Sequence, residues 1–248
     1  MEKIKVIDIS YAQYNVDFGS VKADGVKAVI IRTGYLGKTD TRFDAHMEGA
    51  IKAGLDIGVY TYIMADNVAQ AQIEARETIK RIDKYRGKIT YPVFCDMENG
   101  KYYNEDKFDD DIRTRIIETF CEEISRAGYY PAVYINPAWL EQWVEKKRIQ
   151  GVYDIWLAAW TQSADIPTRY NYGQKMWQWG TDSVKGVNGP VDCDFCYVNY
   201  PEIIRSAGKN YLSDRYLLTA EKEVDSDELS ITEHRLLKLG FVVKKEII

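Results

Sequence analysis

Histidine and cysteine are scarce in this chain, and their scarcity excludes several kinds of site. Only two histidines, His46 and His234, occur among 248 residues, so a His-rich metal site is excluded and a Ser-His-Asp triad would have to use one of them. His46 falls in the middle of a helical run, far from any nucleophile motif. Four cysteines do not make a disulfide framework in a chain this long. Cys193 and Cys196 lie in a strand-like run, where they face opposite sides, and we interpret them as buried thiols rather than a metal or redox pair.

Long apolar runs and concentrated positive charge are missing as well. No apolar run approaches the roughly 20 residues of a membrane span, and residues 1–10 alternate charged residues with Val and Ile and contain no signal-peptide core. The net charge is -5 and no basic stripe is visible, which argues against a nucleic-acid partner. We therefore expect neither membrane insertion nor nucleic-acid binding, and the sequence leaves the oligomeric state open.

The chain does contain a regular alternation of strand-like and helical runs through its first 147 residues. Five βα units are predicted, with strands and helices in turn over 3–9, 16–24, 27–32, 42–53, 57–63, 68–85, 89–97, 109–127, 131–135 and 137–147. Glycine follows several of the helices, as at Gly54 and Gly128, where a left-handed residue ends a helix well. Repeated βα units predict a parallel sheet with right-handed crossovers.

After residue 147 the pattern changes to strands without helices. Three strands are predicted over 154–160, 175–179 and 191–198, and no convincing long helix separates them. Short strands of continuous apolar character fit a sheet that is covered on both faces. Eight strands with five helices therefore predict an α/β fold of the closed, TIM-like barrel type. The alternative is an open doubly wound sheet, but no glycine-rich phosphate loop follows the first strand.

Acidic residues gather at the predicted carboxyl ends of the strands. Asp96 and Glu98 end the buried run that begins at Tyr91, and because alternate residues of a strand share a face they would lie side by side. Two acids this close cannot both ionise freely, and a pair with one charged and one protonated carboxyl is suited to cleaving a glycosidic bond. The alternative is a solvated strand end with two surface acids. Asp8 ends the first strand, and Asp192 and Asp194 lie in the last one; in a barrel, these ends form the site.

Seven short runs, taken in order along the chain, resemble the motifs of one enzyme family. They are Ile7–Gln13, Val16–Phe18 with Val21–Lys27, Ile30–Tyr35, Ala53–Leu55 with Gly58–Tyr62, Asp96-x-Glu98, Met176–Trp179 and Val191-Asp192. Together they resemble glycoside hydrolase family 25, the Chalaropsis-type lysozymes of phage endolysins and bacterial autolysins, over about residues 4–200. The resemblance implies a flattened (β/α)5β3 barrel that hydrolyses the β-1,4 bond between N-acetylmuramic acid and N-acetylglucosamine in peptidoglycan, with no metal and no organic cofactor.

The resemblance also assigns roles to the acids. Glu98 is the expected general acid/base, with its pKa raised by the charges of Asp96, Asp8 and Asp192. Asp96 is expected to stabilise positive charge, to orient the substrate's 2-acetamido group or to attack directly, with retention of configuration. Asp8 and Asp192 complete an acidic floor. For each acid the alternative is a structural role, such as a salt bridge or bonds to backbone amides.

Several other residues are candidates for binding the sugar, with core packing as the alternative for each aromatic one. Tyr60 and Tyr62 share a face at the end of the third strand. Arg32 is a candidate partner for the acids, and Asp194, on the same face of its strand as Asp192, is a candidate for a second-layer role. Aromatic side chains that stack on sugars are expected among Tyr35, Trp160, Trp177 and Trp179. The family often has Trp where this chain has Ala12, and Gly where it has Tyr14, so subsite preference is expected to differ.

Other functions and the C-terminal segment remain open from the sequence. The competing functions are a catalytically inactive wall-glycan-binding module, a hydrolase of another acetamido-sugar polymer such as chitin, and a non-glycosidic barrel enzyme. The expected site of action is the bacterial cell wall; the lack of an export signal fits a phage lysin released through a membrane pore or a protein whose signal was removed. Residues 1–206 are predicted to form the barrel. Residues 207–248, with a helix over 225–239 and a strand over 241–243, form an extension that packs on the barrel, self-associates or begins a wall-binding module.

Overall fold

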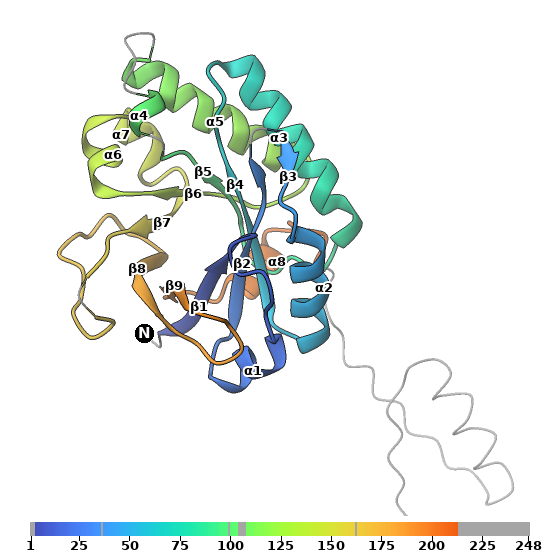
Figure 1. Cartoon of the computed structure of the whole chain (residues 1–248). Helices are drawn as coiled ribbons and strands as arrows, with labels where there is room; N and C mark the ends of the chain where they lie inside the picture. The colour runs from blue at the N-terminus through green and yellow to red at the C-terminus, as the bar shows by residue number, and fades with distance from the viewer. Residues whose placement is uncertain (1–2, 36, 99, 104–107, 162, 213–248) are drawn as a thin grey trace, which may run out of the picture. The chain divides into compact units, whose positions relative to one another are not determined.

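The described part of the chain is built around one sheet that closes on itself. The computed structural model describes residues 3–35, 37–98, 100–103, 108–161 and 163–212 (Figure 1). The sheet has nine strands, of which the two-residue β3 (Lys38–Thr39) pairs only with the end of β2. The eight barrel strands are β1 (Ile4–Ile9), β2 (Ala28–Tyr35), β4 (Asp56–Tyr62), β5 (Val93–Asp96), β6 (Pro131–Ile135), β7 (Asp154–Ala158), β8 (Met176–Ser183) and β9 (Pro190–Cys196).

Closure comes from β1, which has a neighbour on each side. It pairs in parallel with β2, placing Asp8 beside Ile30, and in antiparallel with β9, placing Asp8 beside Asp192. The pairs β2–β4, β4–β5, β5–β6, β6–β7 and β7–β8 are parallel, and β8–β9 is antiparallel. The prediction of a closed eight-stranded barrel is therefore confirmed, and β9 is its one strand that runs against the others.

Helices cover the barrel between the first strands and are missing between the last ones. They are α1 (Phe18–Ala23), α2 (Phe43–Ala53), α3 (Val68–Ile82), α4 (Gly100–Tyr103), α5 (Asp110–Arg126), α6 (Pro137–Gln142), α7 (Lys146–Ile149) and α8 (Tyr200–Ser206). Local chemistry sets their ends: Asp17, Asn67 and Asp109 cap α1, α3 and α5, and Gly54 ends α2 at φ 66°. Figure 1 shows that no helix lies between β7, β8 and β9, as predicted.

At two places the observed helices differ from the prediction. The helix predicted over 137–147 is two short helices, because the backbone N–H of Glu145 donates to the Thr114 side chain at 2.7 Å instead of continuing the helix. The helix α8 was not predicted, although Asn199 caps it and Pro201 stands in its first turn. A tertiary contact, the bond to Thr114, therefore separates α6 from α7. The start of α8 has local signals, its cap and its proline, that the prediction overlooked.

The barrel separates two cores. The larger one lies between the strands and the helices, and the smaller one fills the barrel interior. Val6, Ala28 and Tyr91 belong to the interior core, and Tyr200 and Ile204 of α8 pack against them at the amino ends of the strands. The polar side chains of the barrel interior lie at the carboxyl ends of the parallel strands. The predicted placement of the two cysteines is confirmed, since Cys193 lies in the outer core and Cys196 in the inner one, both as free thiols.

The segment after α8 packs on the barrel as far as it is described. Asn210 is fully buried, its side chain accepts the Tyr130 N–H at 2.7 Å, and it donates to the carbonyls of Ile89 and Tyr91 at 3.1 and 2.9 Å. Residues 207–212, which composition placed in the extension, thus contact the barrel. The helix predicted over 225–239 and the strand over 241–243 lie outside the described residues. Among the described helices, none is both long and apolar enough to span a membrane.

Candidate active site

Five carboxyl groups meet inside the carboxyl end of the barrel. Asp8 ends β1, Asp96 ends β5 with Glu98 two residues later, and Asp192 and Asp194 lie on β9. Three of them share their strand face with a residue of the interior core: Asp8 with Val6, Asp96 with Phe94, and Asp194 with Cys196. The register places Asp8 beside Asp192 and Asp194 beside Val6. The sequence placed the acids at the carboxyl ends of strands, which holds for Asp8 and Asp96. Because β9 runs against the other strands, Asp192 reaches the same end of the barrel from near the start of β9.

Burial is the main influence on the protons of these acids. Asp8, Asp96 and Asp194 are buried, with Asp96 only 4% exposed and Asp194 fully buried. Burial raises the pKa of all three well above the ordinary aspartate value, and the charges of neighbouring carboxylates raise the pKa further. The sequence had predicted like-charge repulsion as the cause; the structure puts desolvation first. Burial thus favours the protonated forms of these three acids.

Glu98 differs from Asp8, Asp96 and Asp194 because it is only half-buried, as Asp192 is. Burial raises the pKa of Glu98, the nearby Tyr134 hydroxyl lowers it, and the charge of Asp192 raises it further. The Asp96 carboxyl, which is more deeply buried and lies between the charges of Glu98 and Asp8, has the larger rise in pKa. Asp96 and Glu98 thus have different environments, as expected for a pair with different roles.

Gln178 on β8 connects the acids to the rim, and the sequence did not single it out. Its Nε2 donates to Asp8 Oδ2 at 2.8 Å, while its Oε1 accepts from the Tyr134 hydroxyl at 3.0 Å and from Trp160 Nε1 at 2.9 Å. The indole is a donor only, so the Trp160 contact determines which end of the amide is oxygen. Alternation along Met176–Trp179 could have found Gln178, because Met176 on the same face fills the barrel interior.

Asp194 is held by a tryptophan on the neighbouring strand. Trp156 Nε1 donates to Asp194 Oδ1 at 2.7 Å, and both residues are buried. Burial first, and then the charge of Asp8, raise the pKa of Asp194 well above the ordinary aspartate value. Its other oxygen, Oδ2, is buried and has no hydrogen-bond partner among the described residues, so the surroundings favour the protonated form of Asp194. The prediction gave Asp194 only a second-layer role; in the structure its neighbours are Trp156 and Asp8.

The two tyrosines of β4 and Arg32 line the β2 side of the acids. Tyr60 packs edge-on against Trp156 inside the barrel, and Asp8 and Asp96 raise its pKa in addition to burial. Burial followed by the charges of Asp96 and Glu98 raises the pKa of Tyr62 to about 12. Arg32 lowers the pKa of Asp96, but its ion pair is with Asp40 at 2.8 Å, a residue that the sequence did not indicate.

The geometry can now be compared with known proteins. Residues 7–187, more than half of the chain, match the family model "Glycosyl hydrolases family 25". The chain belongs to this family. The resemblance drawn from its motifs is therefore confirmed, and the chain is a member of a family of glycoside hydrolases with a TIM-like barrel.

Three relatives illustrate the similarity to family 25 proteins. The modular autolysin LytC of Streptococcus pneumoniae, solved with a synthetic peptidoglycan ligand, is 31% identical with a TM-score of 0.69, covering 79% of this chain and 47% of LytC. The autolytic lysozyme of Clostridium acetobutylicum is 43% identical over 65 residues, which are 26% of this chain and 20% of that protein. A lysozyme of Streptomyces coelicolor is 20% identical with a TM-score of 0.66, covering 86% of this chain and 100% of that one. The chain thus matches less than half the length of the first two relatives.

The rim aromatic residues divide into exposed and buried ones. Trp160 is 62% exposed and stands next to the acids through Gln178, and Tyr35 is exposed and contacts Tyr62 edge-on at 5.6 Å between ring centroids. Trp177 and Trp179 instead lie on the other face of β8, in the outer core. The structure does not support sugar stacking by these two, because Trp177 is 1% exposed and its Nε1 donates to the Ala159 carbonyl at 2.8 Å.

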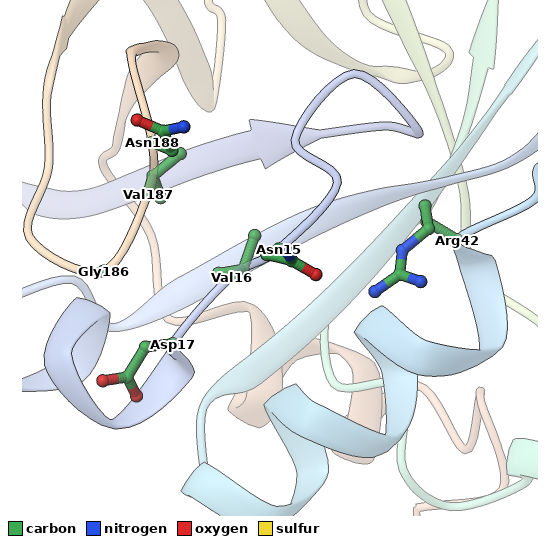
Figure 2. Close-up of a pocket in the computed structure, with 7 residues that line it drawn as sticks. All are labelled: Asn15, Val16, Asp17, Arg42, Gly186, Val187 and Asn188. Carbon is green, nitrogen blue, oxygen red and sulfur yellow. The ribbon is translucent and has the colours of Figure 1, made fainter.

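One hollow of the described surface lies outside the acid cluster. It has a volume of about 580 Å³ and is bordered by Asn15–Asp17, Arg42 and Gly186–Asn188. In Figure 2, Arg42 of α2 and Asn15 extend toward one another across it. The hairpin between β8 and β9 is joined to the opposite wall by a bond from Asp17 N to Gly186 O of 2.8 Å. None of the five acids lines this hollow, so it is not the reaction centre.

Of the two histidines, the described part of the chain contains His46. His46 is buried in α2, where its Nε2 lies 2.9 Å from the Gln13 carbonyl. Within the described ranges, no group of three or more His, Cys, Asp or Glu side chains has the arrangement of a metal site. The acids themselves are the chemical groups that the geometry offers for a reaction.

Proposed function

We propose that this protein is a peptidoglycan hydrolase, an N-acetylmuramidase that cleaves the β-1,4 bond between N-acetylmuramic acid and N-acetylglucosamine. The observation that carries the proposal is the cluster of five carboxyl groups, in which the partly exposed Glu98 follows the buried Asp96 by two residues. Family membership supports a glycoside hydrolase, and the two autolysin relatives support a bacterial wall as the substrate. The cell wall is then the site of action.

Glu98 is the proposed general acid/base. The leaving oxygen of a glycoside needs a proton in an oxocarbenium-like transition state. Burial raises the pKa of Glu98, so its proton is retained closer to neutral pH, and partial exposure lets the carboxyl reach a substrate oxygen. Once the leaving group departs, the carboxylate accepts a proton from the incoming water.

Asp96 is proposed to act on the sugar being cleaved. One of its carboxyl oxygens, Oδ1, is buried and has no hydrogen-bond partner among the described residues. An unsatisfied buried oxygen of this kind suits a substrate donor, and the N–H of a 2-acetamido group supplies one. Asp96 would thus orient the acetamido group, whose oxygen attacks the anomeric carbon, or would itself form an ester; both routes retain configuration.

The remaining residues are proposed to position these two. Asp8 and Asp192 form the acidic floor, Asp194 holds Asp8, and Gln178 links Asp8 to the rim. Tyr60 and Tyr62 face the acids from β4, and Tyr62 is proposed to bond the acetamido group. Arg32 moderates the charge near Asp96, while Tyr35 and Trp160 are proposed to stack on sugar rings.

The decisive experiment digests purified peptidoglycan with the wild type, with Glu98→Gln and with Glu48→Gln. Glu48 is an exposed acid on α2, so it controls for loss of one surface charge. We expect new reducing ends at N-acetylmuramic acid, lost by about 10²–10⁴-fold in Glu98→Gln and kept in Glu48→Gln. An inactive wall-binding module would bind the wall without new ends, and a chitinase would cleave chitin oligomers instead; either result refutes the proposal.

Two measurements separate the finer claims. Proton NMR of the first product anomer tests retention, and inversion would remove both routes through Asp96. Intact-mass spectrometry of the enzyme quenched during turnover distinguishes the routes, since an ester on Asp96 adds the mass of the glycan and an oxazoline on the substrate does not.

A further inference from the structure

A second hollow, of about 280 Å³, lies at the carboxyl end of β2 beside the acids. We call it the β2 pocket; the residues that matter here are Tyr11, Arg32, Tyr35, Lys38 and Asp40. It adjoins the proposed cleft at two points. Tyr35 contacts Tyr62 edge-on, and Arg32 is close enough to Asp96 to lower the pKa of that carboxyl.

The positive and negative charges in this pocket do not balance. Both oxygens of Asp40 are occupied: Oδ2 accepts from Arg32 at 2.8 Å and from the Tyr11 N–H at 3.0 Å, and Oδ1 accepts from the Arg42 N–H at 2.9 Å. Asp40 therefore neutralises Arg32. Lys38 is exposed and has no carboxylate partner in the part of the chain that is described, so its ammonium is the uncompensated charge of the pocket.

The walls of the pocket are flat and partly apolar. Tyr11 is 57% exposed and Tyr35 is 43% exposed. The Arg32 guanidinium lies 4.9 Å from the centre of the Tyr11 ring, which holds the ring in place. The exposed Lys38, in a pocket that Tyr11 and Tyr35 also line, fits a ligand that carries a carboxylate on a short, partly apolar chain.

The acid cluster restricts where an anionic part of a substrate can lie. Five carboxyls repel a carboxylate, whereas the β2 pocket, which adjoins them through Tyr35 and Arg32, contains the unpaired ammonium of Lys38. Chitin carries no anionic group. In contrast, N-acetylmuramic acid carries a lactyl ether to which a peptide with free carboxylates is attached. A wall glycan therefore has both a sugar chain for the acid cluster and an anionic substituent for the β2 pocket.

Resting on the muramidase function proposed above, we propose that the β2 pocket is a subsite for the peptide substituent of the wall glycan. Lys38 binds a carboxylate of the peptide, and Tyr11 and Tyr35 pack against its apolar atoms. The pocket thereby orients the glycan over the acids and makes the enzyme prefer peptide-bearing strands.

The test compares two soluble glycans of equal length, one with its peptides and one whose peptides an amidase has removed and whose freed lactyl carboxylates have then been converted to methyl amides. We expect the wild type to have about tenfold higher kcat/KM on the peptide-bearing glycan, as one charge-assisted bond would give. Lys38→Gln should lower that value about tenfold and so make the two glycans nearly equal, and Lys38→Arg should restore the preference. Lys52→Gln, at an exposed lysine in the last turn of α2, should keep wild-type values on both glycans.

Three outcomes overturn the subsite: no preference in the wild type, a preference that survives Lys38→Gln, or equal losses on both glycans. If the wild type cleaves neither glycan, the proposed function fails, and equilibrium binding to the Glu98→Gln protein still tests the pocket. Tighter binding of the peptide-bearing glycan that is lost on adding Lys38→Gln would support the subsite without the hydrolase; equal binding would refute both.

Discussion

The Asp194 carboxyl gives the most direct test of the proton held inside the barrel. Asp194 is fully buried, accepts from Trp156 Nε1 at 2.7 Å, and has its pKa raised by burial and by the charge of Asp8. Asn has nearly the same shape, so Asp194→Asn keeps an oxygen for the Trp156 N–H and an N–H for Asp8. It therefore imitates the protonated acid but cannot lose the proton.

The sign of the pH effect follows from the raised pKa of Asp194. An unfolded aspartate has a pKa of about 3.9, whereas burial and the charge of Asp8 raise the pKa of the folded one well above that. Above the unfolded value the folded state binds more protons, so the stability present at low pH is lost as pH rises through the folded pKa. The loss is about 1.4 kcal/mol per pH unit within this window. The Asp194→Asn protein does not undergo this loss of stability as the pH rises.

The assay is chemical denaturation of both proteins at several pH values between 4 and 7.5. We expect the difference in free energy of unfolding, variant minus wild type, to rise by up to about 1.4 kcal/mol per pH unit between the unfolded and the folded pKa of Asp194. Asp8 and Asp96 titrate in both proteins, so the difference reports the loss of the Asp194 carboxyl together with its coupling to Asp8. Parallel curves would refute the protonated Asp194.

Asp194→Ala is the matched control for this prediction. It removes the acceptor and leaves the buried Trp156 N–H without a partner. An unsatisfied buried donor costs about 1–3 kcal/mol, and this cost applies at every pH. Asp194→Ala should therefore be less stable than Asp194→Asn by at least that amount. Equal stability of the two variants would show that the Trp156 contact contributes nothing.

Two further predictions concern Tyr134 and Asn210. Tyr134→Phe removes the hydrogen bond that lowers the pKa of Glu98, so the basic limb of the pH profile of kcat/KM should move to higher pH; a shift to lower pH would contradict the contact. Asn210→Ala removes three side-chain hydrogen bonds at the opposite end of the barrel, and should lower the free energy of unfolding by about 2–4 kcal/mol with kcat unchanged. Asn210→Gly, which tolerates the φ of 56°, controls for backbone strain, and it should be destabilised as well if the bonds matter.

The positions of the acids could be predicted from the sequence because the alternation of a buried strand determines which face an ionisable side chain at its end shares with the core. Asp8 and Asp96 each follow apolar residues in a strand, and alternation together with closure brings them to one end of the barrel. The element order predicted that closure, since helices separate the early strands and are missing between the last ones. Polar residues in strands thus marked the interior face at its carboxyl end.

Trp177, Trp179 and Gln178 show where this reasoning stops. A barrel strand is covered on both faces, so alternation indicates which residues share a face but not which face is inside. The sequence correctly gave Trp177 and Trp179 one face, and that face is the outer one. The inner face belongs to Gln178, a neutral residue without the charge that marked the aspartates. Asp40 was missed for another reason: it lies in a connection, and its bond to Arg32 depends on the path of that loop.

The proton inventory of the cluster explains why Glu98, rather than a more buried acid, suits a role that needs both protonation states. Arg32 is the one cation that lowers the pKa of a cluster carboxyl in the described residues, and Asp40 already pairs with it. Five carboxyls with so little compensation must share protons, and the buried members, Asp8, Asp96 and Asp194, have the larger rises in pKa. Glu98 has a smaller rise because it is half-exposed and bonded to Tyr134. A group that gives a proton in one step and takes one in the next works best with a pKa near the working pH, and Glu98 is the member of the cluster whose surroundings keep its pKa from rising as far as those of its buried neighbours.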